Sequence, residues 1–287
     1  MNLFEGLEKF GLQLDTDDIF SEKSENGRSK AAEVNAEEKT EHGETEYLLN
    51  RTVHCPVCGK SFFVLSVKNG RLHRLDSDFD LRPRFQSIDT GKYDVISCPH
   101  CGYTALNRYF TNITAGQIRL VKEGVCSHFK PESNPKTETV CSYEQAVERY
   151  KLALFNAVIK KGRISEKAYI CLKLSWVYRG WIETLGDDGL TDEELLESCR
   201  REERLYYEQA MEGFMKAVGT ETFPMCGMDE STMNILLANM AFRLDRTDIA
   251  SRLVSGILVS RTASAKVKDR ARDLKEEIIA RIHSGNS

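Results

Sequence analysis

The chain has 287 residues, nine of them cysteine, and a formal net charge of −4 at pH 7. No stretch approaches about 18 consecutive apolar residues, which excludes a membrane-spanning helix, and the length allows two domains. The first residues carry neither a basic start nor a long apolar run. We therefore expect a cytoplasmic protein with no membrane partner, whose cysteines are reduced rather than joined in disulfides.

The first 46 residues are predicted to form an acidic, mostly disordered tail that begins with a short amphipathic helix. Residues 1–50 hold 13 acidic and 5 basic side chains, and the polar run 21–46 offers almost nothing to bury. Within residues 1–12 apolar side chains recur near helical spacing, at Leu3, Phe4, Leu7, Phe10 and Leu12. Two roles stay open for this helix: it docks in a groove, on this protein or another, or it caps the helical domain of its own chain.

Two copies of one short phrase predict a metal site: Cys55-Pro56-Val57-Cys58-Gly59 and Cys98-Pro99-His100-Cys101-Gly102. Each places two thiols on one side of a tight turn, and its glycine accepts the positive φ that a chain leaving such a turn needs. Four thiolates fill the tetrahedral shell of a structural zinc ion. The sequence thus predicts one Zn²⁺ per chain, bound by Cys55, Cys58, Cys98 and Cys101, with iron in a rubredoxin-like site as the alternative. The other five cysteines show no paired spacing and are expected to be buried as small apolar side chains.

Residues 47–112 are predicted to form a β-rich zinc ribbon. Residues 61–67 favour a strand, Lys68-Asn69-Gly70 is typical of a hairpin turn, and residues 71–75 resume extended alternation, so we expect these two segments to pair. Residues 93–97 form a strand that runs into the second knuckle. In so small a module, the metal substitutes for an apolar core.

Polar residues crowd the stretch between the knuckles. Arg71, Arg74, Arg82 and Arg84 form a candidate surface for an anion or a partner, since guanidinium groups recognise anions through forked hydrogen bonds. The interpretation we prefer is an internal salt-bridge network that orders this insertion and joins Arg74 to Asp78. Replacement of Arg74 would then lower stability, whereas replacement of an arginine at the surface would change stability little.

From residue 113 onward the periodicity is helical. Residues 113–139 are predicted to form a helix with Thr114 as its N-cap, followed by a polar linker. Residues 140–287 are predicted to form a tetratricopeptide-like array, with a generic helical bundle as the alternative. Its helices are expected near 142–160, 165–185, 191–218, 230–244, 247–260 and 264–283. Small and aromatic residues repeat at the spacing of paired repeat helices, in Ala146/Tyr150/Ala153, Ala210/Phe214/Ala217 and, more loosely, Ala250/Val254/Ile257. The predicted fold class is therefore α+β, with a four-cysteine zinc ribbon followed by an all-α array.

The motifs favour a binding role over catalysis. The sequence holds no Gly-rich phosphate loop, no His-Glu-x-x-His and no nucleophile elbow, so we expect a non-catalytic protein. The first hypothesis is an adaptor that binds a protein or peptide through its ribbon and helical array. The alternative is a nucleic-acid- or ribosome-associated ribbon that uses the four arginines with Lys60 and Lys92. An enzyme whose polar insertion acts on an anionic substrate is the third.

The two knuckles CPVCGK and CPHCGY, the stretch Arg74-Leu75-Asp76-Ser77-Asp78-Phe79 and the lead-in Tyr93-Asp94-Val95 resemble a bacterial family of unknown function found in Firmicutes. The resemblance covers about residues 48–284 and leaves out the acidic tail. It implies a four-cysteine zinc ribbon joined to tetratricopeptide-like helices in a cytoplasmic protein. It implies no activity.

Overall fold

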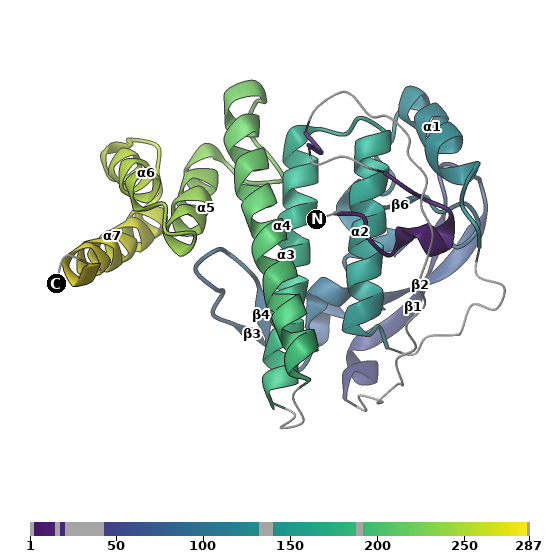
Figure 1. The fold of residues 1–287 in the computed structure, drawn as a ribbon, viewed down its shortest axis with the longest axis horizontal. Helices are drawn as coiled ribbons and strands as arrows, with labels where there is room; N and C mark the ends of the chain where they lie inside the picture. The colour runs from purple at the N-terminus through teal and green to yellow at the C-terminus, as the bar shows by residue number, and fades with distance from the viewer. Residues whose placement is uncertain (1–2, 15–17, 21–42, 132–139, 188–191, 286–287) are drawn as a thin grey trace.

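The computed structural model describes residues 3–14, 18–20, 43–131, 140–187 and 192–285. The fold is α+β, as the sequence predicts: β-hairpins hold a four-cysteine cluster, and helices in packed pairs make up most of the rest (Figure 1). In this part of the chain no helix is both long enough and apolar enough to cross a membrane.

Three antiparallel hairpins form the β region. Strand β1 (Leu48–His54) pairs with β2 (Ser61–Val67), β3 (Arg74–Leu75) with β4 (Arg84–Phe85), and β5 (Val95–Ser97) with β6 (Thr104–Leu106). The expected pairing of residues 61–67 with 71–75 is wrong. The turn of the long hairpin is instead the first knuckle itself, which leaves His54 opposite Ser61 in the register.

Seven α-helices follow in the described residues. Their bounds are α1 (Ala115–Val121), which continues as a π-helix (Lys122–Cys126), α2 (Tyr143–Ile159), α3 (Ile164–Asp187), α4 (Glu193–Thr220), α5 (Glu230–Arg243), α6 (Thr247–Val259) and α7 (Ala265–Gly285). The last six begin and end within two residues of the ranges expected from periodicity. Side chains of Ser142, Asp192 and Asp229 cap the N-termini of α2, α4 and α5. These capping residues explain why the starts of the three helices could be predicted from the sequence.

The small residues of the repeat pattern lie where helices approach one another. Ala146, Tyr150, Ala210 and Phe214 are fully buried. Helices α3 and α4 run side by side over most of their length, and α5, α6 and α7 pack into a separate group at the C-terminal end of the array (Figure 1). Small side chains on these faces allow the close packing that a tetratricopeptide-like array requires.

The start of the chain differs from the expectation. In place of an amphipathic α-helix there is one 3₁₀ turn (Leu7–Phe10), because Gly6 and Gly11 at its two ends adopt positive φ and stop it there. This turn packs on α2 of the same chain. Of the two roles expected for the start of the chain, the contact agrees with capping of its own helical domain. The expected disorder does not hold for Leu14 and Ile19, which are buried. Residues 21–42, where the rest of the tail falls, lie outside the described residues.

Candidate metal centre

The two knuckles have the same backbone geometry. In the first, the Cys55 N–H donates to Lys60 O at 2.9 Å and the Gly59 N–H donates to Cys55 O at 3.0 Å. In the second, Cys98 and Gly102 make the equivalent bonds at 2.9 and 3.0 Å. Both glycines have a φ of 74°, the left-handed conformation that the sequence predicts for them.

These turns bring four sulfurs together. All four Sγ atoms lie within 4.8 Å of one another, and the pairs Cys55–Cys101 and Cys58–Cys98 are each 3.7 Å apart. This separation is too long for a disulfide. With metal–sulfur bonds of about 2.3 Å, a tetrahedron of thiolates has edges of about 3.8 Å. The four residues named from the sequence therefore fit one tetrahedral metal ion.

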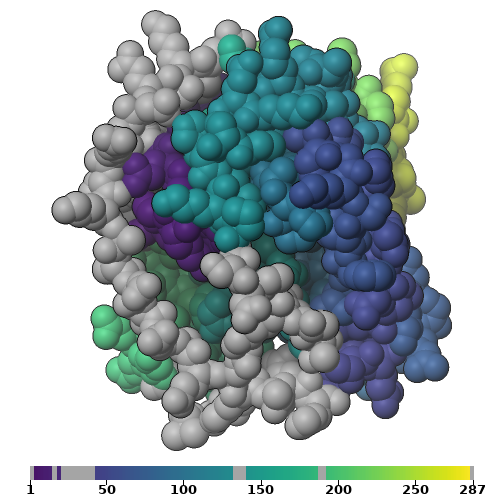
Figure 2. Space-filling model, turned by 90° about the vertical axis from the view of Figure 1, so that its right-hand side faces the viewer, coloured from purple at the N-terminus to yellow at the C-terminus, as the bar shows by residue number. Residues whose placement is uncertain are grey.

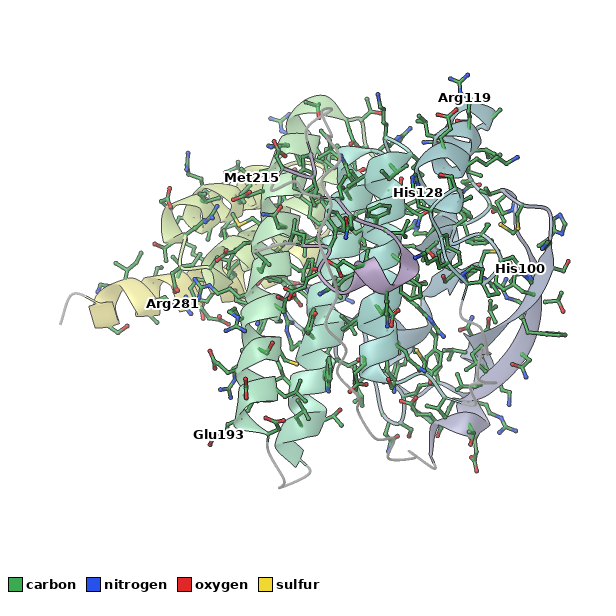
Figure 3. The ribbon with its side chains drawn as sticks, turned by 45° about the vertical axis from the view of Figure 1, so that its right-hand side comes forward. His100, Arg119, His128, Glu193, Met215 and Arg281 are labelled. Carbon is green, nitrogen blue, oxygen red and sulfur yellow. The ribbon has the colours of Figure 1, made fainter. Side chains whose placement is uncertain are left out.

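Contacts among the sulfurs lower the pKa of Cys55 and raise the pKa values of Cys98 and Cys101, so they favour a thiolate at Cys55. Cys55 and Cys98 are fully buried. Hydrogen bonds from the Cys101 and Cys98 side chains, with help from the Cys58 and Val57 backbone, lower the pKa of Cys55. A thiolate is the form that binds a metal. His100, inside the second knuckle, is exposed on the side of the molecule that carries the long hairpin (Figure 3), so it lies outside the sulfur cluster.

A fifth cysteine lies next to this cluster. The π-helix after α1 places the Cys126 thiol within hydrogen-bonding reach of Cys101, and this contact lowers the pKa of Cys126. Sequence reasoning treated Cys126 as a small apolar side chain, since no spacing links it to either knuckle. Its position depends on how the π-helix packs beside the second knuckle.

The second knuckle is fixed to the helical array by α2. The Asn156 amide donates to Gly102 O at 3.1 Å, and the Tyr150 hydroxyl donates to Gly91 O at 2.9 Å. Strands β5 and β6 pack against the same helix. A metal ion at the cluster would join the β1–β2 hairpin to this anchored hairpin.

The insertion between the knuckles forms an ion-pair network with α3, α4 and α5. We call this set the insertion network: Asp78, Asp80, Arg82, Arg84, Asp89, Arg179, Glu183, Glu203 and Arg243. Arg82, whose side chain is 6% exposed, binds both carboxylate oxygens of Glu183 at 3.0 and 3.2 Å. Such forked pairing is the strong form of an arginine–carboxylate contact.

A second arginine holds the insertion from the helical side. Arg179 contacts Asp80 at 2.8 Å, Asp78 at 3.2 Å and Glu203 at 3.1 Å. Asp80 also accepts a hydrogen bond from the Trp176 indole at 3.2 Å. Gly180, the next residue on α3, leaves the space for the neighbouring Arg82–Asp89 pair, since a Cβ there would lie 2.4 Å from the Asp89 carboxylate.

The four arginines of the candidate anion surface are separated by this arrangement. Arg82 is buried and Arg84 contacts Glu183 at 2.7 Å, so both belong to the insertion network. Arg71 and Arg74 are exposed, and Arg74 donates to Ser77 Oγ at 3.4 Å. The expected Arg74–Asp78 pair is wrong, because Asp78 contacts Arg82, Arg84 and Arg179 instead. Binding of an anion by Arg71 and Arg74 stays a prediction.

The helical members of the network were missed from the sequence. Arg179 and Glu183 read as ordinary charged residues of a helix, and nothing in their spacing indicates a partner about one hundred residues earlier.

The environment of the insertion network shifts the pKa values of two of its glutamates. Burial disfavours ionised Glu183, but hydrogen bonds from Arg82 and Arg84 outweigh it and lower the pKa. Burial raises the pKa of Glu203 to about 7 against the opposing effect of Arg179.

The raised pKa of Glu203 predicts a pH dependence of stability. The network holds five carboxylates and four guanidinium groups, so one bound proton makes it neutral. An unfolded glutamate loses its proton near pH 4.3, so the folded state binds more protons between about pH 4.5 and pH 7. The contribution of this group to the free energy of unfolding is therefore present at low pH and is lost as pH rises to about 7. The loss amounts to at most about 4 kcal/mol.

Denaturant unfolding of the intact chain at about pH 5 and pH 8 measures this effect. Glu203→Gln keeps the neutral form, so we expect it to be more stable than the unmodified chain at pH 8 and similar to it at pH 5. Glu193→Gln, at the exposed start of α4, serves as the matched control. Equal pH dependence in the unmodified chain and Glu203→Gln would refute the prediction.

The comparisons agree with the resemblance seen in the knuckles. Residues 48–278 match the family DUF2225, described as an uncharacterized protein conserved in bacteria. The chain belongs to this family. The match begins at β1 and ends in α7, so it contains the sulfur cluster and the insertion network. No curated protein and no solved structure matches the chain significantly.

Proposed function

We propose that this DUF2225 protein is a non-catalytic cytoplasmic adaptor, in which a structural zinc ion stabilises a scaffold that binds a protein or peptide partner. One observation carries the proposal: four protein thiols surround the metal position at tetrahedral spacing. A zinc ion held in this way has no coordination site left for a substrate, which is the arrangement of structural rather than catalytic zinc.

The arrangement of the rest of the molecule supports a scaffold. The metal cluster joins two hairpins, α2 holds the second hairpin, and the insertion network ties the same module to α3, α4 and α5. Two large aromatic side chains project from the β region into solvent, Phe63 with 76% and Phe79 with 70% of its surface exposed. Exposed aromatic groups on a rigid frame are suited to contacts with another protein.

The burial of basic residues weighs against the nucleic-acid alternative. That hypothesis needs Arg82 and Lys92 at the surface, but Arg82 binds Glu183 and Lys92 is 1% exposed and binds Glu44 at 2.8 Å. A nucleic-acid interface uses basic side chains that are free to contact phosphates.

Affinity capture from the native cytoplasm tests the adaptor function. The tagged full chain is compared with a Phe63→Glu, Phe79→Glu variant and with Glu193→Gln as an exposed control. We expect a protein recovered in stoichiometric amount by the full chain and the control, and lost with the double variant. Recovery of nucleic acid alone, with a gel shift that weakens steeply with salt, would overturn the proposal in favour of the alternative.

A further inference from the structure

The beginning of the chain lies across the helical array as a short peptide that contains the 3₁₀ turn Leu7–Phe10. We call residues 3–14 and 18–20 the N-terminal segment. It crosses α2 in Figures 1 and 3, and Figure 2 shows it next to the helical residues that follow the ribbon. Seven of its apolar side chains are less than a tenth exposed: Leu3, Phe4, Leu7, Phe10, Leu12, Leu14 and Ile19.

The helices hold this segment largely by its backbone. The Tyr206 hydroxyl on α4 donates to Leu3 O at 2.6 Å, and Lys151 Nζ on α2 donates to Glu5 O at 3.3 Å. Lys167 Nζ on α3 donates to Ile19 O at 2.5 Å, and it is buried where it does so. Every peptide offers carbonyl oxygens, so donors that bind them recognise a peptide backbone whatever its sequence.

Apolar contacts supply the selectivity that these donors lack. Phe4 packs edge-to-face on Phe155 at 5.6 Å between ring centroids, and Phe10 stacks on Phe129 at 5.8 Å. Gly213 of α4 leaves the space for Phe20, since a Cβ there would lie 2.5 Å from that ring. The surface thus combines backbone donors with pockets for large apolar side chains, as peptide-binding grooves do.

The surface lies within the part of the chain that matches the family, whereas the segment that covers it lies outside that part. The residues that receive the segment lie on α2, α3, α4 and the stretch after α1, all inside the family match at residues 48–278. The N-terminal segment lies before that match. The family domain therefore carries an apolar, carbonyl-binding surface that this chain covers with residues from outside the domain.

We propose that this face of α2–α4 is a peptide-binding groove, occupied within the chain by the N-terminal segment. Its partner is a peptide with leucine and phenylalanine side chains at the spacing of Leu3, Phe4, Leu7 and Phe10, able to form the same 3₁₀ turn, which competes with the segment. The inference rests on the proposed adaptor function and names the partner class. A tethered occupant acts at high effective concentration, so it keeps the groove closed to weak ligands.

A labelled synthetic peptide of residues 1–20 is the probe. It is titrated by fluorescence polarisation against the unmodified full chain and against the full chain carrying Phe4→Asp and Leu7→Asp, which charges two buried anchors of the segment. We expect the variant to bind the probe at least about tenfold more tightly than the unmodified chain, in which the segment competes. Glu5→Gln, at an exposed position of the same segment, is the matched control and should behave as the unmodified chain.

A control probe and a substitute variant complete the test. A probe that carries the same two aspartates should not bind the opened variant. If the double variant fails to fold by far-UV circular dichroism, the milder Phe10→Ser, which removes the stacking contact with Phe129, takes its place. A folded, opened variant that does not bind the probe would show that the segment is a permanent part of the core and would refute the groove. Capture of a partner at Phe63 and Phe79 would in that case still support the adaptor function, so the two failures can be told apart.

Discussion

Purified protein is expected to contain one zinc per chain and to be colourless, and Cys98→Ser is expected to lose the metal together with the fold of the β region. Cys98 is fully buried in the sulfur cluster, where a metal ion would join the β1–β2 hairpin to the second knuckle. Structural zinc contributes roughly 10 kcal/mol to the folding of small modules, so the loss is large. Helices α5, α6 and α7 are expected to survive because they pack apart from the hairpins, whereas α2 loses its contacts with β5 and β6.

Elemental analysis, visible absorption and far-UV circular dichroism measure this outcome. His100→Ala and Cys126→Ser are the matched controls, because one residue lies within the second knuckle and the other contacts Cys101, yet neither belongs to the four-sulfur cluster. Both should retain the zinc. A red preparation that contains iron would overturn the zinc assignment and favour the rubredoxin-like site.

Arg179→Ala is expected to lower the free energy of unfolding by about 3–5 kcal/mol, the second large effect. Arg179 is the closest cation to Asp80, whose side chain is 4% exposed, and it also binds Glu203. Its removal leaves a buried carboxylate with Arg243 at 3.9 Å as the nearest remaining cation. Arg179→Lys keeps the positive charge but lacks the forked guanidinium group that contacts several carboxylates. It should therefore lower the free energy of unfolding by less than Arg179→Ala does.

Denaturant unfolding compares these variants with Arg74→Ala. Because the Arg74 side chain is exposed and donates a long hydrogen bond to Ser77 Oγ, while its pairing with Phe85 in the β3–β4 hairpin is made by the backbone, its removal should change stability by less than about 0.5 kcal/mol. This reverses the loss that the sequence alone predicted for Arg74. An Arg74→Ala variant as unstable as Arg179→Ala would mean that the insertion network does not hold the insertion in solution.

The knuckles and most helices could be predicted from the sequence because neighbouring residues determine them. Each knuckle is a tight turn of a few residues, so its two cysteines, proline and glycine contain nearly everything that determines its shape. The positive φ at Gly59 and Gly102 follows from the same local requirement. Helices α2 to α7 were placed closely because 3.6-residue periodicity and N-caps such as Ser142 are also local signals.

Features that depend on distant partners were decided only by the tertiary structure. Strand β2 pairs with β1 through the first knuckle, although the turn signal at Asn69-Gly70 pointed to the residues that follow. Periodicity shows that Arg82 and Arg179 are polar but not that α3 packs beside the insertion, so it cannot tell a buried ion pair from a solvated charge. The same limit applies to Leu3 and Phe4: their spacing marks them as apolar, but only the packing of α2, α3 and α4 provides the surface that buries them. Local turns and helices depend on neighbouring residues, whereas charge pairing and groove filling depend on which elements meet in space.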